Sequence, residues 1–507
     1  MRKIVLAVLL ATLPLAGWAQ TPGPAATSST GSIAQLGPSL DPFFERYMAE
    51  AHVPGLAYGV VADGRLAYVR AFGSRTQDPA AGVSPDTLFR IASMSKAFTA
   101  LAILKLRDEG RLRLDALAEE YVPELRNWRY PTSDSPRIRV RDLLSHASGF
   151  VTDDPWGDRQ QVLTEAEWTR MLAEGPPFTR APGTAFEYSN YGYALLGRIV
   201  SNVSGRRYQD FIRDEIMRPL GMESSGYDIA ASPVERRAIG WRWENDAFAR
   251  EPDMRDGAFG AMGGVQTSAR DYARWVAFLL SAWPPRDGPE TGPVRRSTVR
   301  ELAQGLNFVT VSRRPGPAGE GACPQAQAYG MGFRVAQDCD LGLTLAHGGG
   351  YPGYGSFLLL LPDQGVGLFA FANRTYSGPS APLWQAAMAL HQARLLAPRR
   401  QPVSDALALM YHYAGDIWQR GTLDGARDRL AMNFLMDRSA ENWARTLAGL
   451  KAQAGECETN APFTPTGILS GTFTWTCERG RIEGQLLLAP TRQPTIQALR
   501  LRVAPAQ

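Results

Sequence analysis

The chain has 507 residues, of which 44% are hydrophobic and 21% are charged, and its formal net charge is +4. This length allows two or three domains, and the composition is typical of a globular protein. The arginines are scattered among acidic residues and no basic run is interleaved with aromatics. The sequence therefore predicts no nucleic-acid partner.

Residues 1–19 have the composition of a secretory signal peptide. A basic start is followed by an apolar run over residues 4–15 and by a cleavage-site-like segment with small residues at residues 17–19. The apolar run is too short for a good membrane span. We therefore expect a secreted or periplasmic protein without an integral membrane span.

Changes in composition along the chain divide the remainder into three parts. Residues 20–37 are rich in Thr, Ser, Pro, Ala and Gly, which predicts a flexible linker with no core of its own. Residues 38–397 are expected to form the main domain. Residues 398–507 are expected to form a small α+β domain without a catalytic constellation, because helical patterns are followed there by strand patterns. Removing the chain from residue 396 onward should leave the activity of the main domain nearly unchanged if this C-terminal domain only recruits a partner.

The first clear strand signal is a hairpin. Apolar runs over residues 55–62 and 65–70 flank Asp63-Gly64, and such runs around Asp-Gly indicate two antiparallel strands.

Ser93 and Lys96 form the only Ser-x-x-Lys in the chain. They begin an expected helix over residues 93–109, where one turn places both side chains on the same face. Only 4 of the 54 basic residues are lysines, and a desolvated Lys, unlike Arg, can lose its proton. Ser93 is therefore a candidate nucleophile whose proton the neutral amine of Lys96 accepts. The alternative is a surface Lys that follows a Ser by chance.

His146, in a Leu-Leu-Ser-His-Ala-Ser-Gly-Phe run over residues 143–150, invites a catalytic interpretation. We favour a structural one. The imidazole and the hydroxyls of Ser145 and Ser148 would satisfy backbone groups at a helix end before Gly149.

Tyr188-Ser-Asn190 is the second candidate site, and it precedes an apolar helix expected over residues 194–200. A Tyr whose proton is lost to a nearby cation can act as a general base. The alternative is that Asn190 caps the helix and an aromatic residue happens to precede it.

The four cysteines fall into two sequence-local pairs, Cys323 with Cys339 and Cys457 with Cys477. This is the simplest of the three possible connectivities, and an oxidising compartment favours it over four free thiols. A strand expected over residues 329–335 lies between Cys323 and Cys339, and a disulfide between these two residues would close a hairpin. No Cys/His cluster has metal-site spacing, so we predict no metal.

His347-Gly-Gly-Gly350 is the third candidate site. The three glycines leave the backbone next to the His347 ring free of side chains. Such a segment suits an edge strand along which a substrate can lie. Apolar strands are expected to follow over residues 357–361 and 366–371, and then a helix over residues 382–396.

Ser-x-x-Lys, Tyr-x-Asn and His-Gly-Gly in this order resemble the serine β-lactamase and penicillin-binding-protein superfamily, in particular class C β-lactamases, D-alanyl-D-alanine carboxypeptidases and related esterases. The resemblance covers residues 38–396 and includes the runs at 143–150, 217–222 and 263–264. It implies an α/β (α+β) fold in which helices flank an antiparallel sheet, and it implies no cofactor.

The resemblance also implies a role for each matching residue. Ser93 would attack a carbonyl and form an acyl-enzyme, while Lys96 and Tyr188 would share the proton transfers, with the ammonium lowering the Tyr188 pKa. Asn190 would hydrogen-bond to Lys96 and to the substrate amide. The backbone N–H groups of Ser93 and Gly350 would form an oxyanion hole.

One departure concerns the third motif. Many members have Lys-Thr-Gly where this chain has His347, Gly348 and Gly349, and a neutral His carries no charge to hold a substrate carboxylate. The loss of this positive charge disfavours efficient β-lactam hydrolysis. The expected nucleophile, base and oxyanion hole are unaffected by it.

We therefore expect an exported serine hydrolase that acts on esters, small amides or D-amino-acid peptides. The first alternative is a protein that binds β-lactams or cell-wall peptides and becomes acylated without efficient turnover. The second is an interaction protein whose C-terminal domain carries the function.

Overall fold

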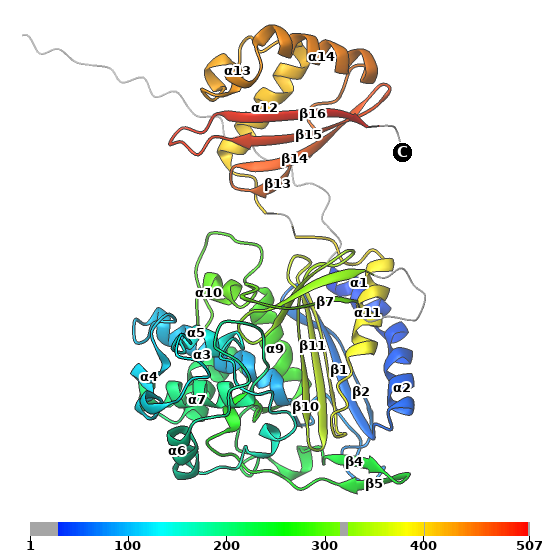
Figure 1. Ribbon diagram of the computed structural model, residues 1–507. Coiled ribbons are helices and arrows are strands. Elements are labelled where there is room, and N and C mark those ends of the chain that lie inside the picture. Colours follow the sequence, from blue (N-terminus) through cyan, green and yellow to red (C-terminus); the bar gives the residue numbers. More distant parts are fainter. Residues whose placement is uncertain (1–28, 315–322, 400, 505–507) are drawn as a thin grey trace, which may run out of the picture.

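The computed structural model describes residues 29–314, 323–399 and 401–504, and Figure 1 shows that they form two units. The larger unit is built around one sheet, and the smaller one follows it in the chain. The predicted signal peptide lies outside the described residues.

An eight-stranded sheet organises the larger unit. Its strand order is β2-β1-β12-β11-β10-β9-β8-β7, and every neighbouring pair is antiparallel. The expected hairpin around Asp63-Gly64 is confirmed as β1 and β2. The strands are β1 (Gly55–Ala62), β2 (Arg65–Gly73), β7 (Asn307–Arg313), β8 (Pro324–Tyr329), β9 (Arg334–Asp338), β10 (Gly342–Tyr351), β11 (Tyr354–Leu361) and β12 (Val366–Ala372).

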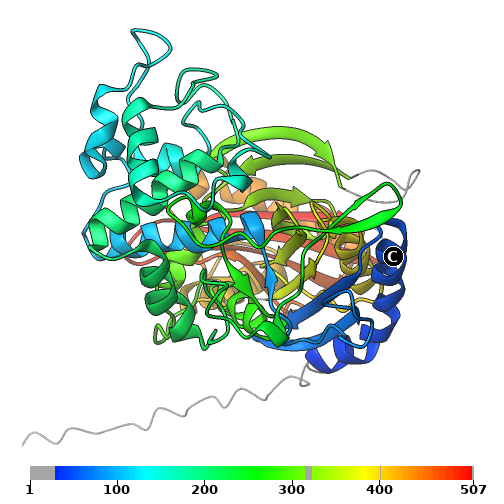
Figure 2. The same cartoon turned by 90° about the horizontal axis from the view of Figure 1, so that it is seen from below.

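Helices cover both faces of this sheet, and Figure 2 shows the N-terminal helices and the helical region on opposite sides of it. On one face lie α1 (Ser29–Leu36), α2 (Asp41–Glu50) and α11 (Ser380–Gln392). On the other lie α3 (Lys96–Asp108) and α9 (Ala269–Leu280). Further helices complete the helical region: α4 (Ala118–Tyr121), α5 (Val140–Leu144), α6 (Glu165–Glu174), α7 (Asn190–Ser204), α8 (Tyr208–Ile212) and α10 (Arg296–Glu301).

The apolar run in β11 follows from burial on both faces. Leu358 and Leu360 pack into the cluster with the α3 side of the sheet, whereas Leu359 and Leu361 pack into the cluster with α2 and α11. Successive side chains of a strand point to opposite faces, so a strand covered on both sides needs apolar residues at every position.

Two short two-stranded sheets lie beside the main sheet. β3 (Phe89–Arg90) pairs with β6 (Gln266–Thr267), and β4 (Trp241–Glu244) pairs with β5 (Ala247–Arg250). The first pair joins the segment that carries Ser93 to the glycine-rich segment before α9. Helix α9 starts directly after this segment, and the Ser268 side chain caps it.

Two sequence expectations need correction. The linker predicted over residues 20–37 is helical from Ser29 to Leu36, because Ile33 is fully buried against the sheet and anchors that helix. The strand predicted over residues 329–335 is interrupted, since β8 ends at Tyr329 and β9 begins at Arg334. Gly332 has a φ of 84°, a backbone conformation that glycine adopts without strain, in the turn between them.

Both predicted disulfides are confirmed, Cys323–Cys339 and Cys457–Cys477. The first brackets the hairpin of β8 and β9, as expected. The second lies in the C-terminal unit.

The C-terminal unit has its own core. Its strand order is β13-β14-β15-β16. Buried and exposed side chains alternate on β14, where Phe473 and Trp475 are buried and Thr472 and Thr474 are exposed. The buried side chains pack with α12 and α14, which confirms the predicted α+β character. The bounds are α12 (Asp405–Arg420), α13 (Phe434–Asp437), α14 (Ala440–Ala454), β13 (Thr464–Gly467), β14 (Ser470–Cys477), β15 (Gly480–Leu488) and β16 (Ile496–Ala504).

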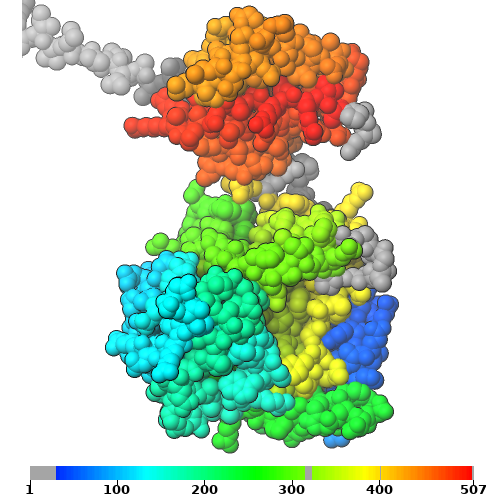
Figure 3. Space-filling view, viewed as in Figure 1, coloured from blue at the N-terminus to red at the C-terminus, as the bar shows by residue number. Residues whose placement is uncertain are grey.

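Figure 3 shows a narrow waist between the two units. The boundary at residues 397–398 stays a prediction. Across the described ranges, the helices are too short or too polar to cross a membrane.

Candidate active site

Ser93 lies in a 3-10 turn, Ala92–Ser95, and the regular helix α3 begins after it at Lys96. Ala92 has a φ of 48°, in the left-handed region that a residue with a Cβ occupies only when its surroundings hold it there. Hydrogen bonds on both sides of the turn do so. The Ile91 amide donates to Val265 O at 3.0 Å, and the Val265 amide donates to Ser95 Oγ at 3.0 Å.

Lys96 is completely buried, and its Nζ contacts three oxygens: Ser93 Oγ at 3.0 Å, Asn190 Oδ1 at 2.7 Å and Met262 O at 2.8 Å. A neutral amine keeps two N–H groups and one lone pair. Asn190 and Met262 offer only acceptors here, so they take the two N–H groups. The lone pair is then left for the Ser93 hydroxyl.

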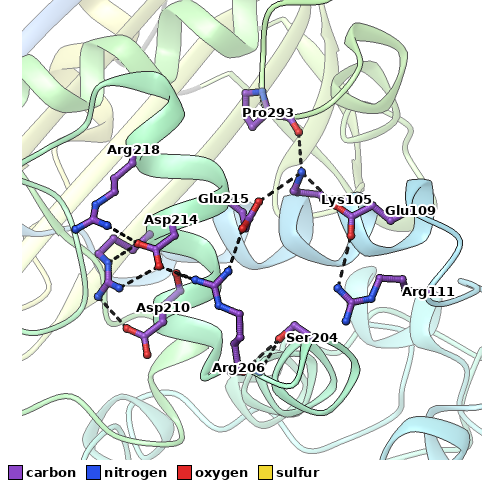
Figure 4. A network of polar contacts seen from close by, with 11 residues as sticks. Lys105, Glu109, Arg111, Ser204, Arg206, Asp210, Asp214, Glu215, Arg218 and Pro293 are labelled. Carbon is purple, nitrogen blue, oxygen red and sulfur yellow. Dashed lines mark hydrogen bonds and ion pairs between the residues drawn. The ribbon is translucent and has the colours of Figure 1, made fainter.

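The electrostatic surroundings of Lys96 favour the loss of its proton. Burial lowers the pKa of Lys96 to about 8, although the carboxylates of Asp154, Asp158 and Asp153 act in the opposite direction. Lys105 on the same helix has a different environment, because it forms ion pairs with Glu109 and Glu215 near the surface (Figure 4).

Tyr188 lies close to both residues, with Lys96 Nζ 4.9 Å from the centroid of its ring. The resemblance implied a Tyr188 pKa lowered by the ammonium, but the net direction is the opposite. Burial raises the pKa of Tyr188 well above its usual value, Tyr329 and Asp154 raise it further, and only the hydrogen bond with Ser93 opposes them. The phenol therefore keeps its proton when Lys96 is already neutral.

Asn190 is the first residue of α7 and is not its cap. The Ser189 side chain caps the helix by accepting from Gly192 N at 3.2 Å. The Asn190 side chain is thereby free to join Lys96 to the neighbouring loop, since its Nδ2 donates to Asp154 Oδ1. Asp153 holds the same helix start by accepting the backbone amides of Asn190 and Tyr191, each at 2.7 Å.

His146 is a buried structural residue, as favoured from the sequence, but its partner differs from the one expected. Its Nδ1 accepts from Ser189 N at 3.1 Å, so the ring ties the Tyr188 segment to the end of α5. Burial and the charge of Lys96 lower the pKa of His146 well below its usual value. The imidazole is therefore neutral.

The third motif lies on β10, which is an interior strand of the sheet over only part of its length. Residues 342–346 pair with β9, whereas within the described part of the chain residues 347–351 pair with β11 alone. The expectation of an edge strand is therefore wrong for β10 as a whole and describes its second half. Gly349 is required there, because a Cβ would lie 2.3 Å from Ile91 O and 2.1 Å from Ser356 Oγ.

His347 is neutral. Its Nδ1 lies 2.6 Å from Gly348 O and its Nε2 lies 2.9 Å from the Tyr329 hydroxyl. A carbonyl can only accept, so Nδ1 carries the proton and Nε2 accepts from Tyr329. Burial lowers the pKa of His347 to about 3.

A cavity of about 610 Å³ brings the three motifs together, since Ser93, Tyr188, His347 and Gly350 all line it. Five polar residues that the sequence interpretation missed also line it: Thr152, Asp154, Asp158, Arg334 and Tyr376. The acidic run at residues 153–158 was the one visible signal for the two aspartates.

Asp158 accepts from the Tyr376 hydroxyl at 3.0 Å. Burial, and then the charge of Asp154, raise the pKa of Asp158 to about 7.

The family model described as Beta-lactamase matches residues 40–393, which is more than half of the chain. The chain belongs to the beta-lactamase family. The superfamily and the fold expected from the three motifs are thereby confirmed. Membership points to a serine hydrolase.

Two curated relatives illustrate the range of the family. Protein flp of Staphylococcus aureus (strain MW2) is 29% identical over 344 residues, which are 66% of this chain and 62% of that protein. D-alanyl-D-alanine-carboxypeptidase/endopeptidase AmpH of Escherichia coli (strain K12) is 25% identical over 366 residues, which are 69% of this chain and 89% of that protein. The chain thus matches less than two thirds of the length of Flp.

Solved structures show the same fold. The octameric penicillin-binding protein homologue from Pyrococcus abyssi superposes with a TM-score of 0.59 at 21% identity, covering 92% of this chain and 99% of that one. A class C beta-lactamase gives a TM-score of 0.56 at 21% identity, covering 73% of this chain and 98% of that one.

Proposed function

We propose that this member of the beta-lactamase family is an exported serine hydrolase that acts through an acyl-enzyme on esters, small amides or D-amino-acid peptides. The observation that carries the proposal is the position of Lys96 Nζ, 3.0 Å from Ser93 Oγ and bonded on its other sides to two acceptors. The two disulfides and the similarity to AmpH support export.

In the first half-reaction, neutral Lys96 removes the Ser93 proton while Oγ attacks the substrate carbonyl. The carbonyl π electrons move onto oxygen, where the backbone N–H groups of Ser93 and Gly350 stabilise the negative charge. The intermediate collapses when the bond to the leaving group breaks. The leaving group takes the proton from the Lys96 ammonium, and the acyl group remains on Ser93. Water then releases the acyl group by the same steps in reverse order.

In this scheme Tyr188 is a hydrogen-bond donor and does not act as the base. Because burial raises its pKa, the phenol keeps its proton at the pH where Lys96 is neutral. It can therefore donate a hydrogen bond to the leaving group or to Ser93, and the general base is Lys96.

The charged side chains that line the cavity indicate which charge a substrate would carry. His347 is neutral, so Arg334 supplies a positive charge to the cavity wall. Among the described residues no ion pair involves Arg334, and its guanidinium lies over the Phe186 ring at 5.6 Å. An unpaired guanidinium beside the nucleophile suits a substrate carboxylate, which favours peptides with a free C-terminus among the candidate substrates.

Intact-protein mass spectrometry tests the proposal. Wild type should gain one acyl group from p-nitrophenyl acetate in a transient adduct and turn the ester over, and Ser93→Ala should do neither. Ser95→Ala is the matched control. It loses a buried acceptor for Val265 N, which lowers its stability by about 1–3 kcal/mol, and it should still form the adduct.

The same experiment with a β-lactam separates the alternatives. An adduct that persists without turnover on either compound would favour a binding protein that becomes acylated. Ester turnover that survives in Ser93→Ala would contradict the proposal.

The pH dependence of ester hydrolysis should report the titration of Lys96. We expect kcat/KM to rise with pH with a midpoint near the Lys96 pKa of about 8, because only the neutral amine is a base. Asp158, with a pKa of about 7, is ionised at that midpoint and raises the Lys96 pKa. Asp158→Asn should therefore move the midpoint to lower pH.

Steady-state rates across the range in which Lys96 titrates would measure this shift. Asp246→Asn, at an exposed position between β4 and β5, should leave the midpoint in place. A midpoint that moves to higher pH in Asp158→Asn would show that Lys96 is not the group that titrates.

A further inference from the structure

A second cavity, of about 350 Å³, lies beside the candidate active site and has mostly apolar walls. We call it the side pocket, and its apolar lining comes from Phe150, Val151, Trp156, Met171, Pro177 and Tyr191. The volume falls in the range of small-molecule sites, which are typically apolar with a few polar groups.

Apart from the exposed carboxylate of Glu174, the charged and hydroxyl groups considered next are already hydrogen-bonded within the protein. Both carboxylate oxygens of Asp153 accept backbone amides at the start of α7. The Tyr191 hydroxyl donates to Met171 O at 3.2 Å, so its ring is the part left to contact a ligand. A ligand in this pocket would therefore meet mainly carbon atoms.

The side pocket and the active-site cavity lie on either side of one loop. Thr152 lines both cavities, and its hydroxyl is hydrogen-bonded to Glu187. Within the same loop Val151 faces the side pocket and Asp154 faces the active-site cavity. The first two residues of α7 also face different sites: Asn190 contacts Lys96, and Tyr191 lines the side pocket.

Two large apolar side chains of this loop are exposed, Val151 at 42% and Trp156 at 49% of their surfaces. Both line the side pocket, so an apolar group bound there would remove their surface from water. Burial of apolar surface of this kind is the main source of affinity in such sites.

We propose that the side pocket binds an apolar acyl group of the substrate, such as an alkyl chain, whose carbonyl Ser93 attacks. This inference rests on the proposed function and adds a substrate class to it. The occupant is part of the substrate because the pocket shares a wall with the cavity that contains Ser93. Esters or amides of medium-chain acids are then better substrates than those of acetate.

The test compares p-nitrophenyl acetate, butyrate and octanoate. In wild type, kcat/KM should rise by about fourfold for each methylene that enters the pocket. Val151→Asp places a charge in the pocket wall and should reduce the ratio of the octanoate to the acetate rate by at least about tenfold, since burying a charge against an alkyl chain is unfavourable.

Val234→Asp is the matched control, because Val234 is 70% exposed and lines neither cavity; it should leave the ratio unchanged. Met171→Trp, which fills the pocket without adding a charge, provides a second variant if Val151→Asp does not fold. A chain-length series that is flat in wild type, or a ratio that neither folded variant changes, would overturn the inference.

A binding measurement keeps this inference separate from the proposed function. Calorimetry on Ser93→Ala should show octanamide binding at least about tenfold more tightly than acetamide, and adding Val151→Asp should abolish the difference. Absence of turnover on every ester in wild type would refute the hydrolase and leave the pocket supported by this difference. Equal affinities for the two amides would refute the pocket, whatever the ester rates are.

Discussion

Replacing Lys96 by Arg should lower kcat/KM for an activated ester by about 10³-fold, the typical contribution of a general base. Arg keeps a positive charge and its N–H donors, but it cannot lose its proton in a protein. The lone pair that the Lys96 amine directs at Ser93 Oγ would therefore be absent. Steady-state rates and the yield of the acyl adduct by mass spectrometry would both measure the loss.

Lys105→Arg is the matched control for this variant. Lys105 lies on the same helix, and its charge serves ion pairs with Glu109 and Glu215. An Arg can maintain such pairs, so the ester rate should stay near that of wild type. Equal rates in Lys96→Arg and wild type would assign the base to another group.

Lys96→Met adds an equilibrium test of the same environment. The pKa of Lys96 is about 8 in the folded protein, where burial disfavours the charge, against an ordinary value of 10.5. Between these pH values the unfolded chain binds more protons than the folded one, so raising the pH stabilises the folded state. The free energy of unfolding of wild type should therefore rise relative to Lys96→Met across this range. Parallel stability curves would show that the amine is not desolvated.

The sequence could identify the motifs because each one is local. Ser93 and Lys96 are separated by one helical turn, and the rarity of lysine made Lys96 conspicuous among 54 basic residues. Tyr188 and Asn190 are two positions apart, and the glycines of the third motif follow His347 directly. The apolar runs of β11 and β12 predicted strands for a similarly local reason, because burial on both faces requires apolar residues at every position.

The rest depends on contacts between distant segments. Arg334 and Asp158 are 176 positions apart and reach the same cavity only through the fold. The pKa of Tyr188 could not be predicted either, since it is raised by burial in the folded protein and by the electrostatic effect of Tyr329 from β8. Gly332 lies inside the strand predicted over residues 329–335, yet its left-handed backbone belongs to the turn between β8 and β9.

Replacing Gly349 by Ala should lower kcat/KM by about 10²-fold, the effect of moving a reacting group by about 1 Å, and should destabilise the fold by about 1–3 kcal/mol through overpacking. The added Cβ would lie 2.3 Å from Ile91 O, a backbone atom two residues before Ser93. Either β10 or the turn that carries Ser93 must then move. Because Gly350 is the next residue on β10, the two expected oxyanion donors would separate.

Gly348→Ala is the control on the same strand, because its Cβ would make an ordinary contact with Phe357 at 3.5 Å. Ester rates and thermal unfolding of both variants would measure the difference, and we expect Gly348→Ala to stay close to wild type.

A double variant separates the two clashes at Gly349. Ser356→Ala removes the Oγ atom that would lie 2.1 Å from the new Cβ, but Ile91 O remains at 2.3 Å. Gly349→Ala/Ser356→Ala should therefore keep the lowered ester rate of Gly349→Ala, because a backbone atom cannot rotate away as a side chain can. Recovery of the ester rate in the double variant would place the constraint on the Ser356 side chain and would leave the spacing between β10 and Ser93 adjustable.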